Sequence, residues 1–261
     1  MKNSGTQIHP TALVESGAEL GVDVQIGPFS IISAETKIGD RCKFLSHVVT
    51  HGRVHMGFDN VVYPFSVLGA PPQDFSYANE PTRVLIGNKN IFRESVTVHR
   101  GTEKDRRETV IGNDNYIMVG CHVAHDCLIE DQVIMANGTA LAGHVQVGSF
   151  VTIGGQTGVV QKARIGDYAF IGAGTILRKD LPPYLCAKGF SEVTGPNLVG
   201  LKRRGISEED VRTACELYKI FYLGTSTTEK SILEMEDKYG SSVFARKFIQ
   251  FLKETKVGVQ R

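Results

Sequence analysis

A histidine and an aspartate stand side by side in the densest polar cluster of the chain. His125 and Asp126 belong to the segment CHVAHD, and Gly143 and His144 stand in a later segment, LAGHVQVG, each at a spacing of 18 from its counterpart. A neutral histidine can take a proton from an alcohol, and a neighbouring carboxylate can hold its tautomer and favour the imidazolium. A glycine directly beside this pair leaves its backbone N–H open to a developing oxyanion. These residue types fit acyl transfer to a hydroxyl group.

A spacing of 18 brings these residues together only if the chain coils with that period. Apolar residues recur at every sixth position through much of the sequence, and the longest unbroken run goes from Ile111 to Leu177. A helix repeats every 3.6 residues and a strand every two, so a sustained period of six fits neither alone. The period is typical of a β-helix, in which three six-residue units close one coil and stacked coils pair as parallel strands about 4.8 Å apart. Such coils place His125 beside Gly143 and then Gln161.

Glycines and two interruptions punctuate the repeat. Glycine follows many of the inward positions, as at Gly27 and Gly39, and we expect it there because it tolerates the backbone angles of a sharp corner. The six-residue phase survives from Leu68 to Ile86, which we interpret as one full coil with a loop outside the prism. A second, charged segment at 99–109 shifts the phase by one residue. Since insertions in solenoids form exposed loops, often on the binding face, we expect loops near 70–84 and 100–110.

The pattern changes after Leu177. Pro182 and Pro183 follow, and prolines interrupt strand pairing. Ser207 with Asp210 resembles a helix cap, and apolar residues then recur at helical spacing over 211–222 and again over 244–252. The sequence therefore predicts a mainly β protein, with a parallel β-helix over residues 1–190 and a C-terminal α-helical domain over 191–261 that covers an open strand edge.

The composition excludes several classes of partner. With 29 basic and 28 acidic residues the chain has no global field to attract nucleic acid or an anionic membrane. No stretch approaches the roughly 20 apolar residues of a transmembrane helix, and the first residues lack an apolar signal core. We therefore expect a cytoplasmic protein with no nucleic-acid partner and no transmembrane segment.

Seven motifs resemble the UDP-N-acetylglucosamine acyltransferases, hexapeptide-repeat enzymes of lipid A and hence lipopolysaccharide biosynthesis. They occur in that family's order and spacing over nearly the whole chain, as SHVV, PPQDFSYANEPTRV, IFRESVTVHRGT, HVAHDC, LAGHVQVG, LPPY and GLKRRGIS. The resemblance implies a left-handed β-helix and a homotrimer with sites between subunits. It implies transfer of a 3-hydroxyacyl chain from acyl carrier protein to the glucosamine 3-position of UDP-N-acetylglucosamine. No metal is implied, and no cofactor beyond the carrier's phosphopantetheine.

The resemblance also implies a role for individual residues. His125 would be the general base, Asp126 its partner and Gly143 the donor to the oxyanion. Residues near Phe170 and Ala173 would measure the acyl chain. The substrates would be bound by Gln73, Asp74, His99, His122, His144, Gln161, Asn197, Arg203 and Arg204.

Four departures from the family pattern surround these substrate contacts. The family often has lysine at the position of Ser76, histidine at Val160 and Ser191, and an acidic residue at Val199. At Lys162, two residues after Val160, the family has phenylalanine. The departures leave open whether the acceptor is a 3-hydroxyl or a 3-amino group, and whether the uridine contacts are rearranged. Ala173 is intermediate in size, so it does not indicate the length of the acyl chain.

Three other functions also stay open. An acetyltransferase on the same prism would use acetyl-CoA and need only a short pocket. A metal site could use His122, His125 and Asp126 as zinc ligands, although the chain lacks a helical HExxH motif. A zinc hydratase resembling the γ-class carbonic anhydrases would use three histidines with HxxxxH spacing, whereas the candidates here, His99, His122 and His125, are spaced 23 and 3 apart. A non-catalytic scaffold would gain no stability from a UDP-sugar.

Overall fold

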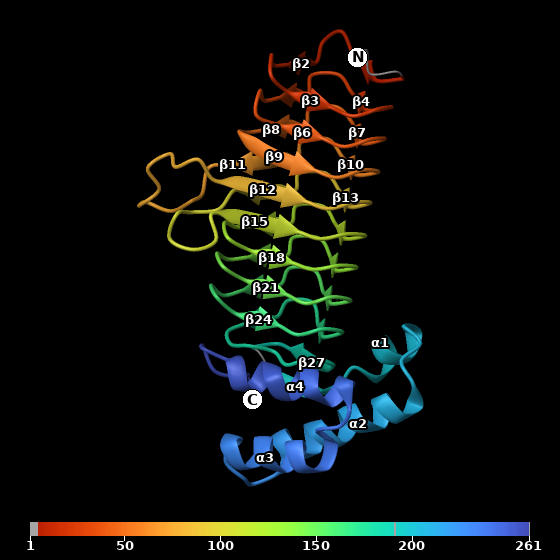
Figure 1. Ribbon diagram of the computed structural model, residues 1–261, viewed down its shortest axis with the longest axis vertical. Coiled ribbons are helices and arrows are strands. Elements are labelled where there is room, and N and C mark those ends of the chain that lie inside the picture. Colours follow the sequence, from red (N-terminus) through yellow and green to blue (C-terminus); the bar gives the residue numbers. More distant parts are fainter. Residues whose placement is uncertain (1–4, 191, 261) are drawn as a thin grey trace.

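The computed structural model describes residues 5–190 and 192–260, which form a three-sided prism with helices at one end (Figure 1). Each side of the prism is a sheet of short strands, and the chain visits the three sides in the same order in every coil. We call the sides sheets A, B and C in the order of the first three strands. Strands of successive coils pair in parallel, as a β-helix requires.

The described strands divide among the three sides as follows. Sheet A holds β1 (Gln7–Ile8), β4 (Gln25–Ile26), β7 (Lys43–Phe44), β10 (Val61–Val62), β13 (Ile91–Phe92), β16 (Tyr116–Ile117), β19 (Ile134–Met135), β22 (Thr152–Ile153), β25 (Phe170–Ile171), β27 (Leu185–Lys188) and β28 (Glu192–Pro196). Sheet B holds β2 (Leu13–Val14), β5 (Ile31–Ile32), β8 (Val49–Thr50), β11 (Val67–Ala70), β14 (Thr97–His99), β17 (His122–Val123), β20 (Ala140–Leu141), β23 (Gly158–Val159) and β26 (Ile176–Leu177). Sheet C holds β3 (Glu19–Leu20), β6 (Lys37–Ile38), β9 (Arg53–Met56), β12 (Arg83–Ile86), β15 (Glu108–Ile111), β18 (Leu128–Ile129), β21 (Gln146–Val147) and β24 (Arg164–Ile165).

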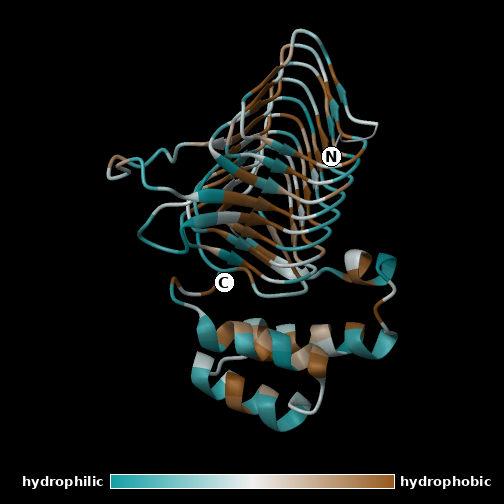
Figure 2. Cartoon of the chain, turned by 45° about the horizontal axis from the view of Figure 1, so that its top comes forward, coloured by the Kyte–Doolittle hydropathy of each residue, from teal (hydrophilic) through white to brown (hydrophobic). Residues whose placement is uncertain are grey.

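The residues of the six-residue repeat fill the interior of the prism. From Ile26 to Leu177 they are at most 5% exposed, and Figure 2 shows hydrophobic positions repeating from coil to coil. Each such side chain stabilises the fold by roughly 1.5–3 kcal/mol when fully buried. The one polar member, Thr50, is buried with its hydroxyl 2.9 Å from that of Thr36, and it accepts a hydrogen bond from the Ser33 N–H at 3.0 Å. The repeat tolerates threonine there because the polar atom is satisfied.

For the repeat glycines other than Gly69, which has a φ of +84°, the expected physical reason is wrong. Gly27 and Gly39 are not among the residues with positive φ; that conformation belongs to corner residues such as Phe29 and Arg41. A Cβ on Gly27 would lie 2.5 Å from the Leu45 carbonyl oxygen of the next coil. Glycine is needed at these positions because neighbouring coils approach too closely for a side chain.

The expected full coil between Leu68 and Ile86 is also wrong. Val67 of β11 pairs with Thr97 of β14, so this coil runs from 67 to 97, whereas the preceding coil runs only from 49 to 67. The chain passes only from sheet B to sheet C between Leu68 and Ile86, and the added length, equal to two six-residue units, leaves the prism. The period could not reveal this, because an insertion of two whole units preserves the phase just as a full coil of three units does.

The two interruptions form loops that project from the same edge of the prism (Figure 1). The first loop, residues 71–82, connects β11 to β12, and the second loop, residues 100–107, connects β14 to β15. Thr97 pairs with His122, a separation one greater than a whole number of six-residue units, which accounts for the shift in phase by one. Both loops therefore lie at the corner where sheet B turns into sheet C.

Helices cover the C-terminal end of the prism (Figure 1). They are α1 (Leu198–Arg203), α2 (Glu208–Tyr218) with a π-helical extension η1 (Lys219–Leu223), α3 (Thr228–Tyr239) and α4 (Val243–Glu254). The predicted cap of α2 is confirmed, since the Ser207 hydroxyl accepts a hydrogen bond from the Asp210 N–H at 3.1 Å. The sequence did not predict α1, α3 or the strands β27 and β28. None of the helices in the described ranges has the length and hydropathy of a membrane span.

The helices are fastened to the last coils by aromatic stacking and ion pairs. The rings of Tyr184 and Phe244 stack with centroids 3.8 Å apart, and the Tyr184 hydroxyl donates a hydrogen bond to the Phe244 carbonyl. Lys247 of α4 pairs with Asp167 at 2.7 Å. The prolines at 182 and 183 do not end sheet A, because β27, which follows them, pairs in parallel with β25.

Candidate functional site

The predicted catalytic residues lie at the corner between sheets B and C. His125 and Asp126 occupy the turn between β17 and β18, and Gly143 and His144 occupy the same turn one coil later. Both loops leave the prism at this corner, two and one coils earlier. The 18-residue spacing thus brings the four residues together as the sequence predicts.

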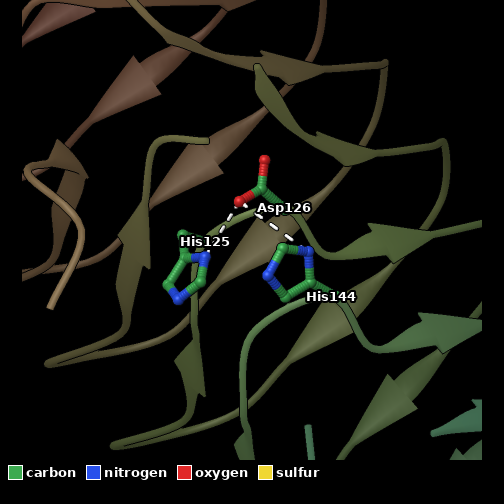
Figure 3. Close-up of side chains that lie close together, drawn as sticks. All are labelled: His125, Asp126 and His144. Carbon is green, nitrogen blue, oxygen red and sulfur yellow. Dashed lines mark hydrogen bonds and ion pairs between the residues drawn. The ribbon is translucent and has the colours of Figure 1, made fainter. Parts of the chain in front are cut away.

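His125 and Asp126 form a buried hydrogen-bonded pair (Figure 3). The Nδ1 atom of His125 lies 2.9 Å from Oδ2 of Asp126, and the two side chains are 9% and 0% exposed. The Asp126 carboxylate also accepts hydrogen bonds from Thr102, at 3.0 Å from the backbone N–H and 2.6 Å from the hydroxyl. Burial opposes ionisation, but the hydrogen bonds from His125 and Thr102 outweigh it and lower the pKa of Asp126. Asp126 is therefore a carboxylate that holds His125 by Nδ1 and leaves Nε2 free.

Gly143 packs directly on the His125 imidazole. A Cβ built on Gly143 would lie 2.5 Å from Cε1 and 2.7 Å from Nε2 of that ring. The Gly143 N–H makes no hydrogen bond with any residue in the described part of the chain. The position therefore offers an open N–H beside the basic nitrogen, and any larger residue would displace the ring.

His144 lies edge-on to His125, with ring centroids 5.0 Å apart and planes at 90°. Its Nδ1 is 2.7 Å from Oδ2 of Asp105, a residue of the second loop, and 3.9 Å from Oδ2 of Asp126 (Figure 3). Two carboxylates therefore face the same nitrogen of His144.

A second pair of histidines lies on sheet B next to this corner. The rings of His99 and His122 meet edge to face at 4.8 Å, and the Thr97 hydroxyl lies 2.7 Å from Nδ1 of His122. Burial, with smaller effects from His122, His125 and Arg100, lowers the pKa of His99 to about 4. Burial and His125 also lower the pKa of His122. Both rings are therefore neutral near pH 7 and can act as hydrogen-bonding groups.

The two loops border a cavity of about 1070 Å³ that opens beside His144. Its lining includes Asp74 of the first loop, Lys104 of the second, and Gln161 from the next coil of the prism. Lys104 and Asp74 pair at 3.4 Å. Gln73 is exposed on the first loop beside Asp74. The structure thus gathers the predicted substrate residues Asp74, His144 and Gln161 around one opening.

The departure at Ser76 has a visible consequence at Asp74. The Ser76 hydroxyl and backbone N–H donate to Oδ1 of Asp74 at 2.7 and 2.8 Å, and these bonds, with a smaller effect from Lys104, lower its pKa to about 2. Ser191 lies outside the described residues. Nothing in the structure explains the departures at Val160 and Val199.

Five other predicted residues lie elsewhere on the same chain. Asn197 caps α1 by accepting from the Gly200 N–H at 3.0 Å and donates to the Tyr168 carbonyl, and Arg204 donates to Gln132 at 2.8 Å. These contacts hold α1 at the corner between sheets C and A. The remaining three, all exposed, are Arg203 in α1, Phe170 on the outer face of sheet A and Ala173 at the corner between sheets A and B. One chain does not bring these five to His125.

The sequence did not predict three contacts of the second loop. Thr102 donates to Asp126, Asp105 faces His144, and Lys104 pairs with Asp74. All three residues stand in the charged segment that shifts the phase of the repeat. The shift in phase is the sequence feature that points to these contacts, because it places the segment at the corner that carries His125. It does not tell which side chain reaches which partner.

A metal could in principle use the cluster of His125, Asp126 and His144, whose ligand atoms lie within 4.8 Å of one another. The contacts of these three side chains fit hydrogen bonding better than metal binding. Both ring Nδ1 atoms already face carboxylates, and Asp126 accepts two hydrogen bonds from Thr102. His122, named as a possible ligand from the sequence, is not in the cluster.

Comparison with known proteins adds independent evidence. The model of UDP N-acetylglucosamine O-acyltransferase domain 2 matches residues 180–260, and that of the bacterial transferase hexapeptide repeat matches residues 108–143. LpxA from Acinetobacter baumannii is 37% identical, with 97% of this chain and 99% of that chain covered and a TM-score of 0.95. The chain belongs to the UDP-N-acetylglucosamine acyltransferase family.

Other members of this acyltransferase family agree closely in structure. The UDP-N-acetylglucosamine O-acyltransferase of Moraxella catarrhalis is 35% identical over 97% of this chain and 99% of that one, with a TM-score of 0.95. The UDP-N-acetylglucosamine acyltransferase of Francisella novicida is 32% identical over 98% and 94%, with a TM-score of 0.96. Membership confirms the predicted fold, a left-handed parallel β-helix of hexapeptide repeats followed by helices.

Proposed function

We propose that this chain transfers a 3-hydroxyacyl group from acyl carrier protein to the glucosamine 3-hydroxyl of UDP-N-acetylglucosamine, in lipid A biosynthesis. The observation that carries the proposal is the buried His125–Asp126 pair packed under the open N–H of Gly143. Family membership supports the choice of substrates. No cofactor is needed besides the phosphopantetheine of the carrier protein.

The geometry suits a direct transfer. His125 Nε2 takes the proton of the 3-hydroxyl while the oxygen attacks the thioester carbonyl. The negative charge that develops on the carbonyl oxygen is stabilised by the Gly143 N–H, and Asp126 stabilises the imidazolium. When the tetrahedral intermediate collapses, the carbon–sulfur bond breaks and the imidazolium returns its proton to the departing thiolate.

The proposal includes a homotrimer with its sites between subunits. Asn197, Arg203, Arg204, Phe170 and Ala173 lie away from His125 within one chain, so they could join the site only from a neighbour. The outward positions of sheet B include Leu13, Ile31 and Ile176, which are 55%, 39% and 40% exposed. Burying such apolar positions against other copies would stabilise an assembly.

We also propose a cytoplasmic location. The free thiols of Cys42, Cys121 and Cys127 are compatible with a reducing compartment.

Purified protein with UDP-N-acetylglucosamine and a panel of 3-hydroxyacyl carrier proteins tests the proposal. Mass spectrometry of the product identifies the acyl length, and comparison with a 3-amino UDP-sugar identifies the acceptor atom. His125→Ala should lower kcat by about 10²–10⁴-fold while circular dichroism stays unchanged. His51→Ala, on an exposed residue of an earlier coil, is the matched control. Absence of product with every chain length, or full activity of His125→Ala, would contradict the proposal.

A further inference from the structure

The second loop contacts the catalytic corner at two points. Near its start, Thr102 is 3% exposed and donates to the Asp126 carboxylate through its backbone N–H and its hydroxyl. Three residues later, Asp105 lies 2.7 Å from Nδ1 of His144 through Oδ2. One short segment therefore holds both the partner of His125 and the neighbouring imidazole.

The contact with Asp105 fixes which nitrogen of His144 carries the proton. A carboxylate can only accept hydrogen bonds, so the Nδ1 atom of His144 must donate. The other nearby oxygen, Oδ2 of Asp126, lies farther from the same nitrogen, at 3.9 Å. In the neutral ring the lone pair is then on the Nε2 atom of His144, which lies on the side of the ring away from both carboxylates.

The second loop is itself anchored. Lys104 pairs with Asp74 of the first loop at 3.4 Å, and the Thr102 backbone N–H donates to the Asp126 carboxylate at 3.0 Å. His144 is 14% exposed and Asp105 is 41% exposed, so the carboxylate approaches the ring from the solvent side. Anchoring matters because a side chain can orient a partner only if its own backbone is held.

We propose that Asp105 is a positioning residue, which holds the His144 imidazole in its Nδ1–H tautomer with Nε2 on the side of the ring that faces His125 (Figure 3). The effect of Asp105 on the reaction rate rests on the proposed function, whereas its effect on the tautomer of His144 does not. Neutral imidazole can protonate either nitrogen, so an oriented carboxylate selects one tautomer and one ring orientation. His144 then presents an acceptor beside Gly143 and His125 with no reorganisation when substrate binds.

The tautomer can be measured without any enzymatic activity. Ring ¹⁵N signals of histidine-labelled protein at pH 8 should show the Nδ1–H form for His144, with the signal assigned by its loss in His144→Gln. Asp105→Ala should shift this ring toward the Nε2–H form. Glu103→Gln removes the same charge from the same loop without touching the ring, and it should leave the signal unchanged. An unaltered His144 tautomer in Asp105→Ala would overturn the proposal.

Kinetics supply the second arm of the test. Asp105→Ala should lower kcat/KM by about 10- to 100-fold. Asp105→Asn keeps an acceptor oxygen at nearly the same place and should recover most of that loss, and Glu103→Gln should match the unsubstituted protein. Equal losses in Asp105→Ala and Glu103→Gln would refute positioning by Asp105. If the unsubstituted protein forms no product, the proposed function fails, and the ¹⁵N measurement still decides the role of Asp105.

Discussion

At the scale of single residues, the site depends on how closely Gly143 approaches His125. A methyl group on Gly143 would overlap the imidazole, with separations of 2.5 and 2.7 Å to two ring atoms. The ring would have to rotate, and the hydrogen bond to Asp126 would be lost with it. The glycine is therefore a requirement of the proposed catalytic geometry and not of the backbone, because Gly143 is not among the residues with positive φ.

This close approach predicts the behaviour of Gly143→Ala. We expect kcat to fall by about 100-fold, since misplacing a catalytic group by about 1 Å can cost that much. Steady-state kinetics with the acyl carrier substrate measure the effect. His51→Ala, on an exposed residue of an earlier coil, is the control. Equal kcat values for the two variants would show that the ring tolerates the methyl group.

His99 predicts a pH dependence of stability. Its pKa is about 4 in the folded chain, against about 6.5 in an unfolded one. Between these values the unfolded state binds a proton that the folded state does not, so the free energy of unfolding falls as the pH drops from about 6.5 to about 4. The loss attributable to this residue is up to about 3 kcal/mol.

Urea unfolding at several pH values measures this contribution. His99→Asn should show a weaker fall in unfolding free energy between pH 6.5 and pH 4 than the unsubstituted chain. His51→Asn, on an exposed histidine, should keep the full dependence. A dependence that is the same in all three proteins would remove His99 as its cause.

At the scale of elements, the period of the sequence determines the regular part of the fold. Six-residue spacing predicts the three faces, and its multiple of 18 predicts that His125 and Gly143 meet. The same spacing cannot tell the path of residues that leave the prism. The contacts of Thr102 and Asp105 therefore could not be predicted, because they depend on loop conformation. The predicted loop near 70–84 is confirmed, but the predicted full coil between Leu68 and Ile86 is wrong for a related reason, since an insertion of two whole six-residue units leaves the phase unchanged.

The C-terminal elements show a different limit. The predicted helical spacing found α2 and α4, whose apolar faces pack on other elements. The short α1 and the mostly exposed α3 carry few buried residues, Leu201 in α1 and Ser231 and Met235 in α3. Their sequences therefore have a weak apolar period. The strand β27 follows two prolines, and its pairing with β25 depends on the edge that the last coil presents.

The attachment of α4 to the prism predicts a local effect of Phe244→Ala. The ring of Phe244 stacks on Tyr184, which is buried, and truncation of such a pair costs about 3 kcal/mol. Hydrogen exchange measured by mass spectrometry should increase in α4 and stay unchanged in β13 to β22. Val243→Ala, on a side chain that is 67% exposed, is the control. Faster exchange throughout the prism would mean that helices and coils unfold as one unit.

At the scale of the whole molecule, one chain holds two separated sets of predicted site residues. His125 and its neighbours lie at the corner between sheets B and C, whereas α1 with Arg203 lies at the corner between sheets C and A. A closed ring of identical subunits can bring one set against the other in every interface. We therefore expect a mass in solution of about three times 28.5 kDa by light scattering.

Mixed trimers test whether the two sets meet between subunits. Arg203 is exposed and has no partner in the described ranges, so Arg203→Ala should lower activity without loss of fold. In trimers assembled at random from His125→Ala and Arg203→Ala chains, roughly a quarter of the intersubunit sites would combine an intact His125 with an intact Arg203. The mixture should then regain about that fraction of the unsubstituted activity. If both residues acted within one chain, every site would carry one substitution and the mixture would stay as inactive as its components.

A matched mixture controls for effects of assembly itself. His125→Ala and Asp126→Ala alter two residues that one subunit supplies together, since their side chains lie 2.9 Å apart within the chain. Trimers mixed from these two variants should therefore regain no activity. Recovery in both mixtures would indicate stabilisation by mixing and not complementation. Recovery only with Arg203→Ala would establish that each site takes its base from one subunit and its arginine from the next.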